Sequence, residues 1–132
     1  MKSRWKTNRY SVYNLGYHLI WTPKYRKKVL TNGVDVRLKE LLIKKSKELD
    51  LVIEKMEVMP DHVHIFVKSE PIHAPHYIVQ QFKGYSSRVL RQEFSQLRMV
   101  LPTLWTRSYY CESVGNISEE AVKRYIENQK NV

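Results

Sequence analysis

Cysteine and long apolar runs are what this sequence has least of. Cys111 is the only cysteine in 132 residues, so the chain can form no internal disulfide and no thiolate metal cage. No apolar run approaches the roughly 20 residues that span a bilayer, and the N-terminus lacks the apolar stretch typical of a signal peptide. We therefore expect neither a membrane protein nor a secreted one, but a cytoplasmic protein.

Acidic residues are scarce relative to basic ones. The chain has 23 Lys and Arg against 13 Asp and Glu, a formal net charge of +10 and a pI of about 9.7. This balance favours a polyanionic partner, usually nucleic acid, over the alternative of an unspecialised basic surface. The length and a hydrophobic fraction of 42% suit one domain, over residues 1–132, with a real core.

The hydrophobic pattern predicts a mixed α+β fold. We expect strands over 11–21, 51–59, 62–68 and 108–114, and helices over 34–49, 75–96 and 118–128. Residues 1–11 read as a flexible leader, and residues 116–132 as a mobile C-terminal helix. The order strand–helix–strand–strand–helix–strand is that of the split βαβ, ferredoxin-like and RRM-like arrangement. It predicts a four-stranded antiparallel sheet with two helices on one face and an open second face, which many such sheets use to bind nucleic acid.

Two histidines one residue apart stand out in the third expected strand. The run is Asp61-His62-Val63-His64-Ile65-Phe66-Val67. Since strand side chains alternate, His62 and His64 share one face while the valines and the isoleucine cover the core on the other. Two imidazoles at this spacing can share one metal ion. For the pair alone, two exposed or hydrogen-bonded histidines are at least as good an interpretation.

The last expected helix carries Tyr125 and Gln129, four residues apart on one helix face. Val122 and Ile126 form its apolar stripe, displaced by about 100° from that face. Tyr125 is therefore not needed as a core residue of this helix. A surface tyrosine without a further role is the alternative interpretation.

Several stretches together resemble one family. The run from Met59 to His64 resembles the His-hydrophobe-His motif of the HUH single-strand endonucleases. Tyr125 with Gln129 resembles the nucleophile helix of their smallest members, the single-tyrosine (TnpA-type) transposases of minimal bacterial and archaeal insertion sequences. Residues 17–26, 82–88 and 104–110 resemble the same family, so the resemblance runs in order over nearly the whole chain.

The resemblance implies a metal-dependent chemistry. His62, His64 and Gln129 would hold a divalent ion, Mg²⁺ or Mn²⁺, and Tyr125 would attack phosphorus to give a 5′-phosphotyrosine and a free 3′-OH. No nucleotide cofactor is implied, in agreement with the absence of a Gly-rich phosphate-binding loop. His18 is an additional candidate for a ligand or a phosphate contact, with a structural hydrogen bond as the alternative.

The implied partner is single-stranded DNA with hairpins. Candidate contacts to it, each of which could also be ordinary solvated surface, are Lys24, Arg26, Lys27, Lys28, Lys83, Arg88, Arg91 and Arg107. Trp105 and Tyr110 are expected in the core rather than as stacking surfaces. The family also implies a homodimer with composite active sites, no membrane association, and a cytoplasmic protein that joins the nucleoid when bound to DNA.

The sequence therefore predicts a metal-dependent tyrosine transposase that cleaves and rejoins single-stranded DNA at hairpin-marked element ends. One alternative is a domesticated HUH nuclease that uses the same chemistry on chromosomal palindromes. A second is a non-catalytic module that binds single-stranded nucleic acid on its open sheet. A third is a metal nuclease that cleaves with water and forms no covalent adduct with DNA.

Overall fold

The computed structural model of the chain describes residues 6–7, 12–13, 15–69, 72–114 and 127. The strands are β1 (Lys6–Thr7), β2 (Val12–Tyr13), β3 (Leu15–Trp21), β4 (Val52–Met59), β5 (His62–Ser69) and β6 (Tyr110–Val114). The helices are α1 (Val34–Glu48), α2 (Pro75–Glu93) and α3 (Ser95–Val100), with one short 3-10 turn, η1 (Lys24–Arg26). No helix in the described ranges is long and apolar enough to cross a bilayer.

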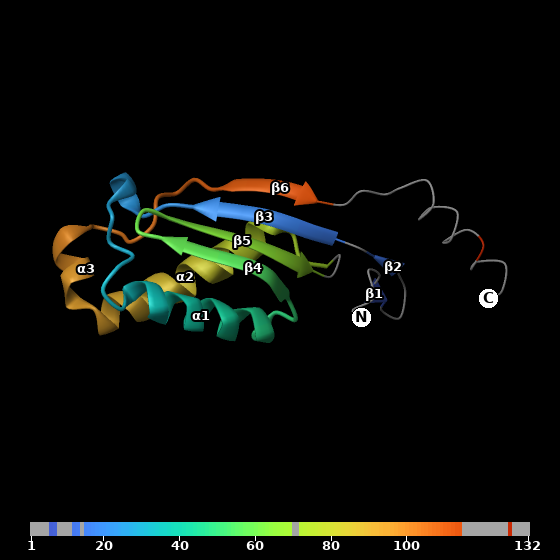
Figure 1. Cartoon of the computed structure of the whole chain (residues 1–132), viewed down its shortest axis with the longest axis horizontal. Coiled ribbons are helices and arrows are strands. Elements are labelled where there is room, and N and C mark those ends of the chain that lie inside the picture. Colours follow the sequence, from blue (N-terminus) through green and yellow to red (C-terminus); the bar gives the residue numbers. More distant parts are fainter. Residues whose placement is uncertain (1–5, 8–11, 14, 70–71, 115–126, 128–132) are drawn as a thin grey trace.

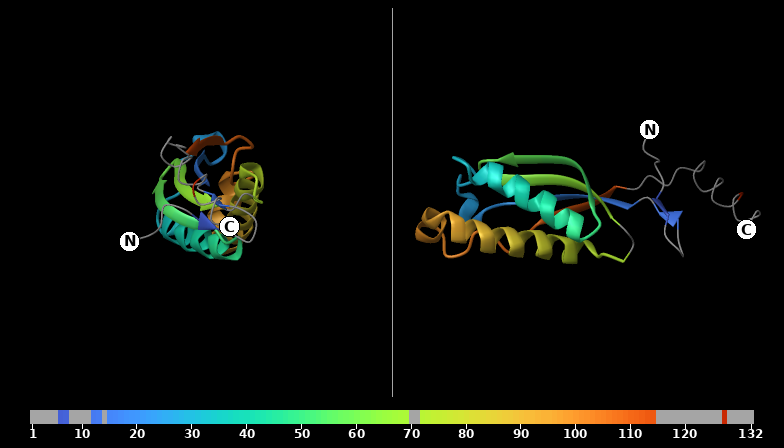
Figure 2. Two further views of the ribbon diagram at one scale, coloured as in Figure 1. Left: turned by 90° about the vertical axis from the view of Figure 1, so that its right-hand side faces the viewer. Right: turned by 90° about the horizontal axis from the view of Figure 1, so that it is seen from below.

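Four strands form one antiparallel sheet in the order β4-β5-β3-β6, while β1 pairs with β2. Helices α1 and α2 pack against each other and cover one face of this sheet (Figure 1). The two further views in Figure 2 show both helices on that same side, so no described helix covers the opposite face. The order and the directions of the strands are those of the split βαβ arrangement, and the predicted fold class is confirmed.

The core lies between the sheet and the helices, because each strand turns its apolar residues to one side. Val63, Ile65 and Val67 of β5 are fully buried, as their alternation predicts. They join a core whose other members include Leu19, Trp21, Leu38, Leu41, Leu42, Ile78, Val79, Phe82 and Leu90. The side chains between the three buried β5 residues therefore face away from the helices, and His64 is one of them.

Three predicted boundaries are wrong by two residues or more. The strand expected over 11–21 is part of the four-stranded sheet only from Leu15, where β3 begins, while Val12–Tyr13 pairs with β1. The helix expected over 75–96 ends at Glu93, because Phe94 has extended backbone (φ −120°, ψ 90°) and separates α2 from the short α3. Apolar residues continue at helical spacing through Phe94, so the periodicity does not reveal the break. The fourth strand of the sheet begins at Tyr110 rather than Ser108.

The two terminal predictions lie mostly outside the described residues. Of the expected leader, Lys6–Thr7 pairs with Val12–Tyr13, and the rest of 1–11 is not among the described residues. Of the expected C-terminal helix, Glu127 alone is described, and it is helical. Tyr125 and Gln129 lie outside the described residues.

Candidate active site on the open face of the sheet

The register of the central strands brings a third histidine to the pair on β5. Strand β3 pairs Ile20 with His64 and His18 with Phe66, so His18 shares the open face with His64. His18 Nδ1 lies 3.1 Å from His64 Nε2, a hydrogen bond in which one ring donates and the other accepts. The His18 ring also stacks on Phe66, with ring centroids 4.8 Å apart. The predicted auxiliary residue is thus a direct neighbour of His64.

The second nitrogen of His64 faces strand β4. Glu57 pairs with His64 in the strand register, and its Oε2 lies 3.8 Å from His64 Nδ1. This separation is too long for a hydrogen bond, but the carboxylate charge favours a proton on Nδ1. With the proton there, Nε2 carries the lone pair, which either accepts a hydrogen bond from His18 or binds a metal ion.

His62 is oriented by the residue that precedes it. Its Nδ1 donates to Asp61 Oδ1 at 2.9 Å, and Arg26 donates to the other carboxylate oxygen, Oδ2, at 3.1 Å. The hydrogen bond from His62, and then that from Arg26, holds the pKa of Asp61 below its usual value, although partial desolvation opposes this shift. Asp61 is therefore a carboxylate that keeps the proton of His62 on Nδ1 and leaves the Nε2 lone pair for another partner.

The donor set fits part of a divalent metal site. His62 and His64 offer two imidazole nitrogens on one strand face, and imidazole is a common ligand of transition metal ions, Mn²⁺ among them. Among the described residues, no group of three or more His, Cys, Asp or Glu side chains is arranged to hold a metal ion. The role of His18 as a metal ligand or phosphate contact stays a prediction; in the structure it is a hydrogen-bonding neighbour of His64. The predicted third ligand, Gln129, and the predicted nucleophile, Tyr125, are outside the described residues.

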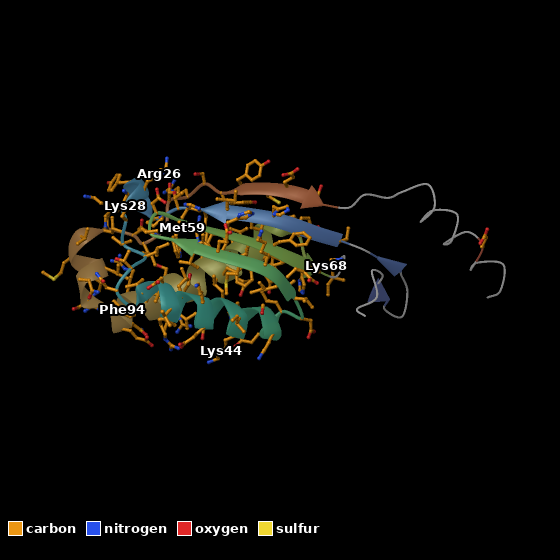
Figure 3. The ribbon with its side chains drawn as sticks, viewed as in Figure 1. Arg26, Lys28, Lys44, Met59, Lys68 and Phe94 are labelled. Carbon is orange, nitrogen blue, oxygen red and sulfur yellow. The ribbon has the colours of Figure 1, made fainter. Side chains whose placement is uncertain are left out.

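Four of the predicted DNA contacts gather on η1 and the residues just after it. Lys24 is partly exposed, and Arg26, Lys27 and Lys28 are exposed. Figure 3 shows Arg26, Lys28 and Met59 toward the same end of the sheet, with Lys68 near the other end. Because Met59 pairs with His62 in the strand register, this cationic segment stands at the end of the sheet where the histidine strand begins.

The predicted contacts on α2 differ from those on η1. Lys83 Nζ donates to the carbonyl oxygens of Thr106, Arg107 and Ser108, and burial lowers the pKa of Lys83. Arg91 donates to Leu101 O at 3.0 Å. These donors are engaged within the protein, which leaves Lys83 and Arg91 fewer free N–H groups for phosphate.

The remaining two predicted contacts are open to solvent. Arg88 and Arg107 are exposed, and the Arg88 guanidinium lies 5.7 Å from the centre of the Tyr85 ring. Arg88 belongs to α2, which packs on the sheet face opposite the histidines (Figure 2).

Of the two aromatic residues expected in the core, one is buried and the other is exposed. Trp105 is buried as predicted, and its Nε1 donates to Ser86 Oγ at 3.1 Å. The expectation for Tyr110 is wrong, since its side chain is 54% exposed. Tyr110 pairs with Ile20 in the sheet and therefore lies on the open face. The face is set by the register between the strands, which a local sequence pattern does not reveal.

Sequence reasoning missed two neighbours of the histidines, Asp61 and Glu57, and the contact between Arg26 and Asp61. Asp61 stands next to His62 in the sequence, so adjacency was a usable signal for it. Glu57 reaches His64 through strand pairing, and Arg26 reaches Asp61 across 35 positions, so neither contact has a local signal.

Comparison with known proteins gives a consistent family. The family model described as "Transposase IS200 like" matches residues 11–129. The ISDra2 transposase TnpA of Deinococcus radiodurans is 38% identical over 126 residues, which cover 94% of this chain and 90% of that protein. The transposase for insertion sequence element IS200 of Salmonella typhimurium is 26% identical over 119 residues, which cover 89% of this chain and 78% of that one.

Solved structures agree with the sequence matches. The crystal structure of a candidate transposase from Deinococcus radiodurans R1 has a TM-score of 0.77 at 37% identity, covering 94% of this chain and 97% of that one. A REP-associated tyrosine transposase bound to a REP hairpin has a TM-score of 0.60, covering 96% of this chain and 73% of that one. At 16% identity, this second likeness shows the shared fold alone.

Proposed function

The chain belongs to the IS200-like transposase family of the HUH superfamily, and on that premise we propose that it cuts and rejoins single-stranded DNA at hairpin-marked ends of a mobile element. The family assignment makes it a transposase, an enzyme that cleaves and rejoins DNA. The observation that carries the finer proposal is the oriented His62 and His64 pair on an open sheet face, beside the cationic η1 segment. A strand that crosses this face would meet the histidines without having to enter a closed pocket.

The proposed nucleophile is Tyr125. Its hydroxyl oxygen forms a bond to the scissile phosphorus while the bond from phosphorus to O3′ breaks, and the leaving oxygen takes up a proton to become a 3′-OH. A free tyrosine pKa of about 10 is too high for efficient attack at neutral pH, so the hydroxyl needs activation. The 5′-phosphotyrosine link is a phosphodiester like the one broken, so a 3′-OH from another strand reverses the step and rejoins DNA.

The proposed metal ligands are His62, His64 and Gln129, with Mg²⁺ or Mn²⁺ as the ion. When bound, the ion supplies Lewis-acid polarisation of the scissile phosphate. The chain's own contribution is orientation: Asp61 holds the Nδ1 proton of His62 and so directs Nε2 outward. With the His64 proton on Nδ1, the lone pair on Nε2 accepts a hydrogen bond from His18 Nδ1 until it binds the ion. No nucleotide cofactor enters this proposal.

The proposed partners are hairpin-bearing single-stranded DNA and a second copy of the chain. A dimer in which the Tyr125 segment serves the histidines of the other copy would form two composite sites. Mixing a Tyr125→Phe chain with a His62→Ala chain tests this arrangement. If the sites are composite, a mixed dimer holds one site with both an intact nucleophile and intact ligands, and cleavage by the mixture returns.

A covalent-adduct assay tests the chemistry. The probe is a hairpin oligonucleotide with a single-stranded flank and a label at its 3′ end, since a 5′-phosphotyrosine keeps the 3′ fragment attached to protein. We expect a labelled protein band with Mn²⁺ that EDTA abolishes. Tyr125→Phe should remove the band and keep DNA binding, while Tyr77→Phe, an exposed tyrosine on α2, should leave it unchanged.

The alternative functions give different outcomes in the same assay. A band that persists in Tyr125→Phe refutes the assigned nucleophile. Cleaved DNA without any protein band indicates a nuclease that uses water. Binding without cleavage by the wild type indicates a non-catalytic module.

A further inference from the structure

The η1 turn holds two consecutive side-chain-bearing residues in left-handed backbone. Tyr25 has φ 60° and ψ 17°, and Arg26 has φ 50°. Asn32 and Asp50 have similar φ values, but Asn and Asp adopt this region readily, whereas a bulky aromatic residue rarely does. Such strain persists where the surrounding structure imposes it, and it concentrates at functional sites.

The surroundings of η1 impose this conformation. Pro23 forms an isolated bridge with Trp105, which is itself part of the core. The backbone bonds that hold the segment run from Lys24 N to Leu104 O at 2.8 Å, Arg26 N to Pro23 O at 2.9 Å and Leu30 N to Pro60 O at 3.1 Å. The Arg26 side chain adds its bond to Asp61. The fold therefore fixes this turn at several points.

The consequence of the fixed turn is an aromatic ring held in water. Tyr25 is 70% exposed, and the Lys24 ammonium lies 5.4 Å from the centre of its ring. Arg26, Lys27 and Lys28, which follow Tyr25 in the sequence, are exposed. An exposed aromatic ring next to several cations in the chain has the chemistry of a single-stranded nucleic-acid platform, in which the ring stacks on a base and the cations contact phosphates.

We infer that Tyr25 is a stacking platform for one unpaired base of the DNA strand that is cut. The inference rests on the proposed function and names the part of the substrate that this turn contacts. The place of this contact relative to the active site follows from two side-chain hydrogen bonds, Arg26 to Asp61 and His62 to Asp61, which join the η1 turn to the candidate catalytic face. The base must be unpaired, because a base inside a duplex already has both faces covered by its neighbours.

Binding measurements with three DNA probes test the inference. The probes are a hairpin with a single-stranded flank, the same hairpin with a blunt end, and the flanked hairpin with one abasic site moved along the flank. We expect Tyr25→Ala to weaken binding of the flanked hairpin roughly 5- to 100-fold and to leave the blunt hairpin unchanged. At one flank position, the abasic site should remove the difference between wild type and Tyr25→Ala.

Matched variants separate stacking from other roles. Tyr25→Phe keeps the ring and should bind as the wild type does. Tyr77→Ala removes another exposed tyrosine, on α2, and should change neither affinity. Tyr25→Gly relieves the left-handed strain, so its thermal stability should equal or exceed that of the wild type while its affinity for the flanked hairpin falls.

Two results would overturn the stacking inference. One is a folded Tyr25→Ala or Tyr25→Gly protein that binds the flanked hairpin with wild-type affinity. The other is an equal loss on the blunt hairpin, which would indicate a duplex contact. If the wild type forms the covalent adduct and either result appears, the stacking inference alone fails. If the wild type neither binds the flanked hairpin nor forms the adduct, the proposed function fails with it.

Discussion

Replacing Asp61 should weaken the proposed metal binding without changing any of the three proposed ligands. The carboxylate makes two hydrogen bonds, accepting from His62 Nδ1 at 2.9 Å and from Arg26 at 3.1 Å. Asp61→Ala removes both, so His62 loses the group that fixes its tautomer and ring orientation. Asp61→Asn keeps an acceptor oxygen for His62 and loses the negative charge.

The expected loss of Mn²⁺ affinity in each variant depends on which hydrogen bond to His62 remains possible. Loss of a partner that orients a metal-bound histidine typically lowers metal affinity by about 10- to 100-fold. We expect Asp61→Ala toward the upper end of this range, because Asp61 is the hydrogen-bond partner of His62 Nδ1 among the described residues. Asp61→Asn should lie toward the lower end, because its amide oxygen can still accept from that nitrogen.

The assay is a Mn²⁺ titration of the isolated protein, in which binding is measured by calorimetry and by the electron paramagnetic resonance signal of free Mn²⁺. No DNA is present, so the result is independent of turnover. Glu93→Ala is the matched control, because it removes another carboxylate paired with an arginine, Arg37, and changes the net charge equally. It lies on the helical side and should keep wild-type affinity.

Two outcomes refute this reasoning. The first is wild-type Mn²⁺ affinity in a folded Asp61→Ala protein, which would show that the carboxylate does not support His62 as a ligand. The second is an equal loss in Glu93→Ala, which would trace the effect to overall charge. A wild type that binds no Mn²⁺ would remove the metal site itself.

Three further predictions concern the packing of the fold and the different roles of two lysines. Gly84→Ala should stabilise the protein by roughly 0.5–1 kcal/mol, because Gly84 is exposed within α2 and an added Cβ would meet nothing within 4 Å; urea unfolding measures this, and an unchanged or lower midpoint contradicts it. Ile65→Ala should destabilise by about 2–5 kcal/mol, since Ile65 is fully buried behind the histidines; a loss below about 1 kcal/mol would contradict that packing. Lys83→Met should lower the free energy of unfolding by about 1 kcal/mol, allowing for partial exposure, because three hydrogen bonds to carbonyl oxygens are lost. It should leave the salt dependence of DNA binding unchanged, whereas Lys28→Ala should reduce the slope of log K for DNA binding against log salt concentration by about 1. The reverse pattern, with Lys83→Met altering the slope, would make Lys83 a phosphate contact.

The face on which the histidines lie was predictable because it is a local property. A strand repeats every two residues, so the burial of Val63, Ile65 and Val67 is enough to send His64 to the other side. The order of strands and helices likewise restricts the topology to a few arrangements, of which the split βαβ is one. Tyr125 and Gln129 stay predictions, supported by the family to which the chain belongs.

The predictions for the end of α2 and for the face of Tyr110 were wrong because the local sequence is compatible with more than one structure. The apolar spacing through Phe94 is compatible with one helix or two, and only the extended backbone at that residue separates α2 from α3. Tyr110 could face either side of β6 until the pairing with β3 decides its direction.

By itself, the sequence determined which residues alternate on β5, which fold class their order allows, and which family they resemble. Tertiary structure alone decided what surrounds the histidines. It placed His18 next to His64, 46 positions away in the sequence, and joined Arg26 to Asp61. It also brought Lys83 within hydrogen-bond distance of the backbone carbonyl of Thr106. It also forced Tyr25 into left-handed backbone with its ring exposed. The physical reason is range: alternation follows from the geometry of one strand, whereas these contacts exist only once distant segments are packed together.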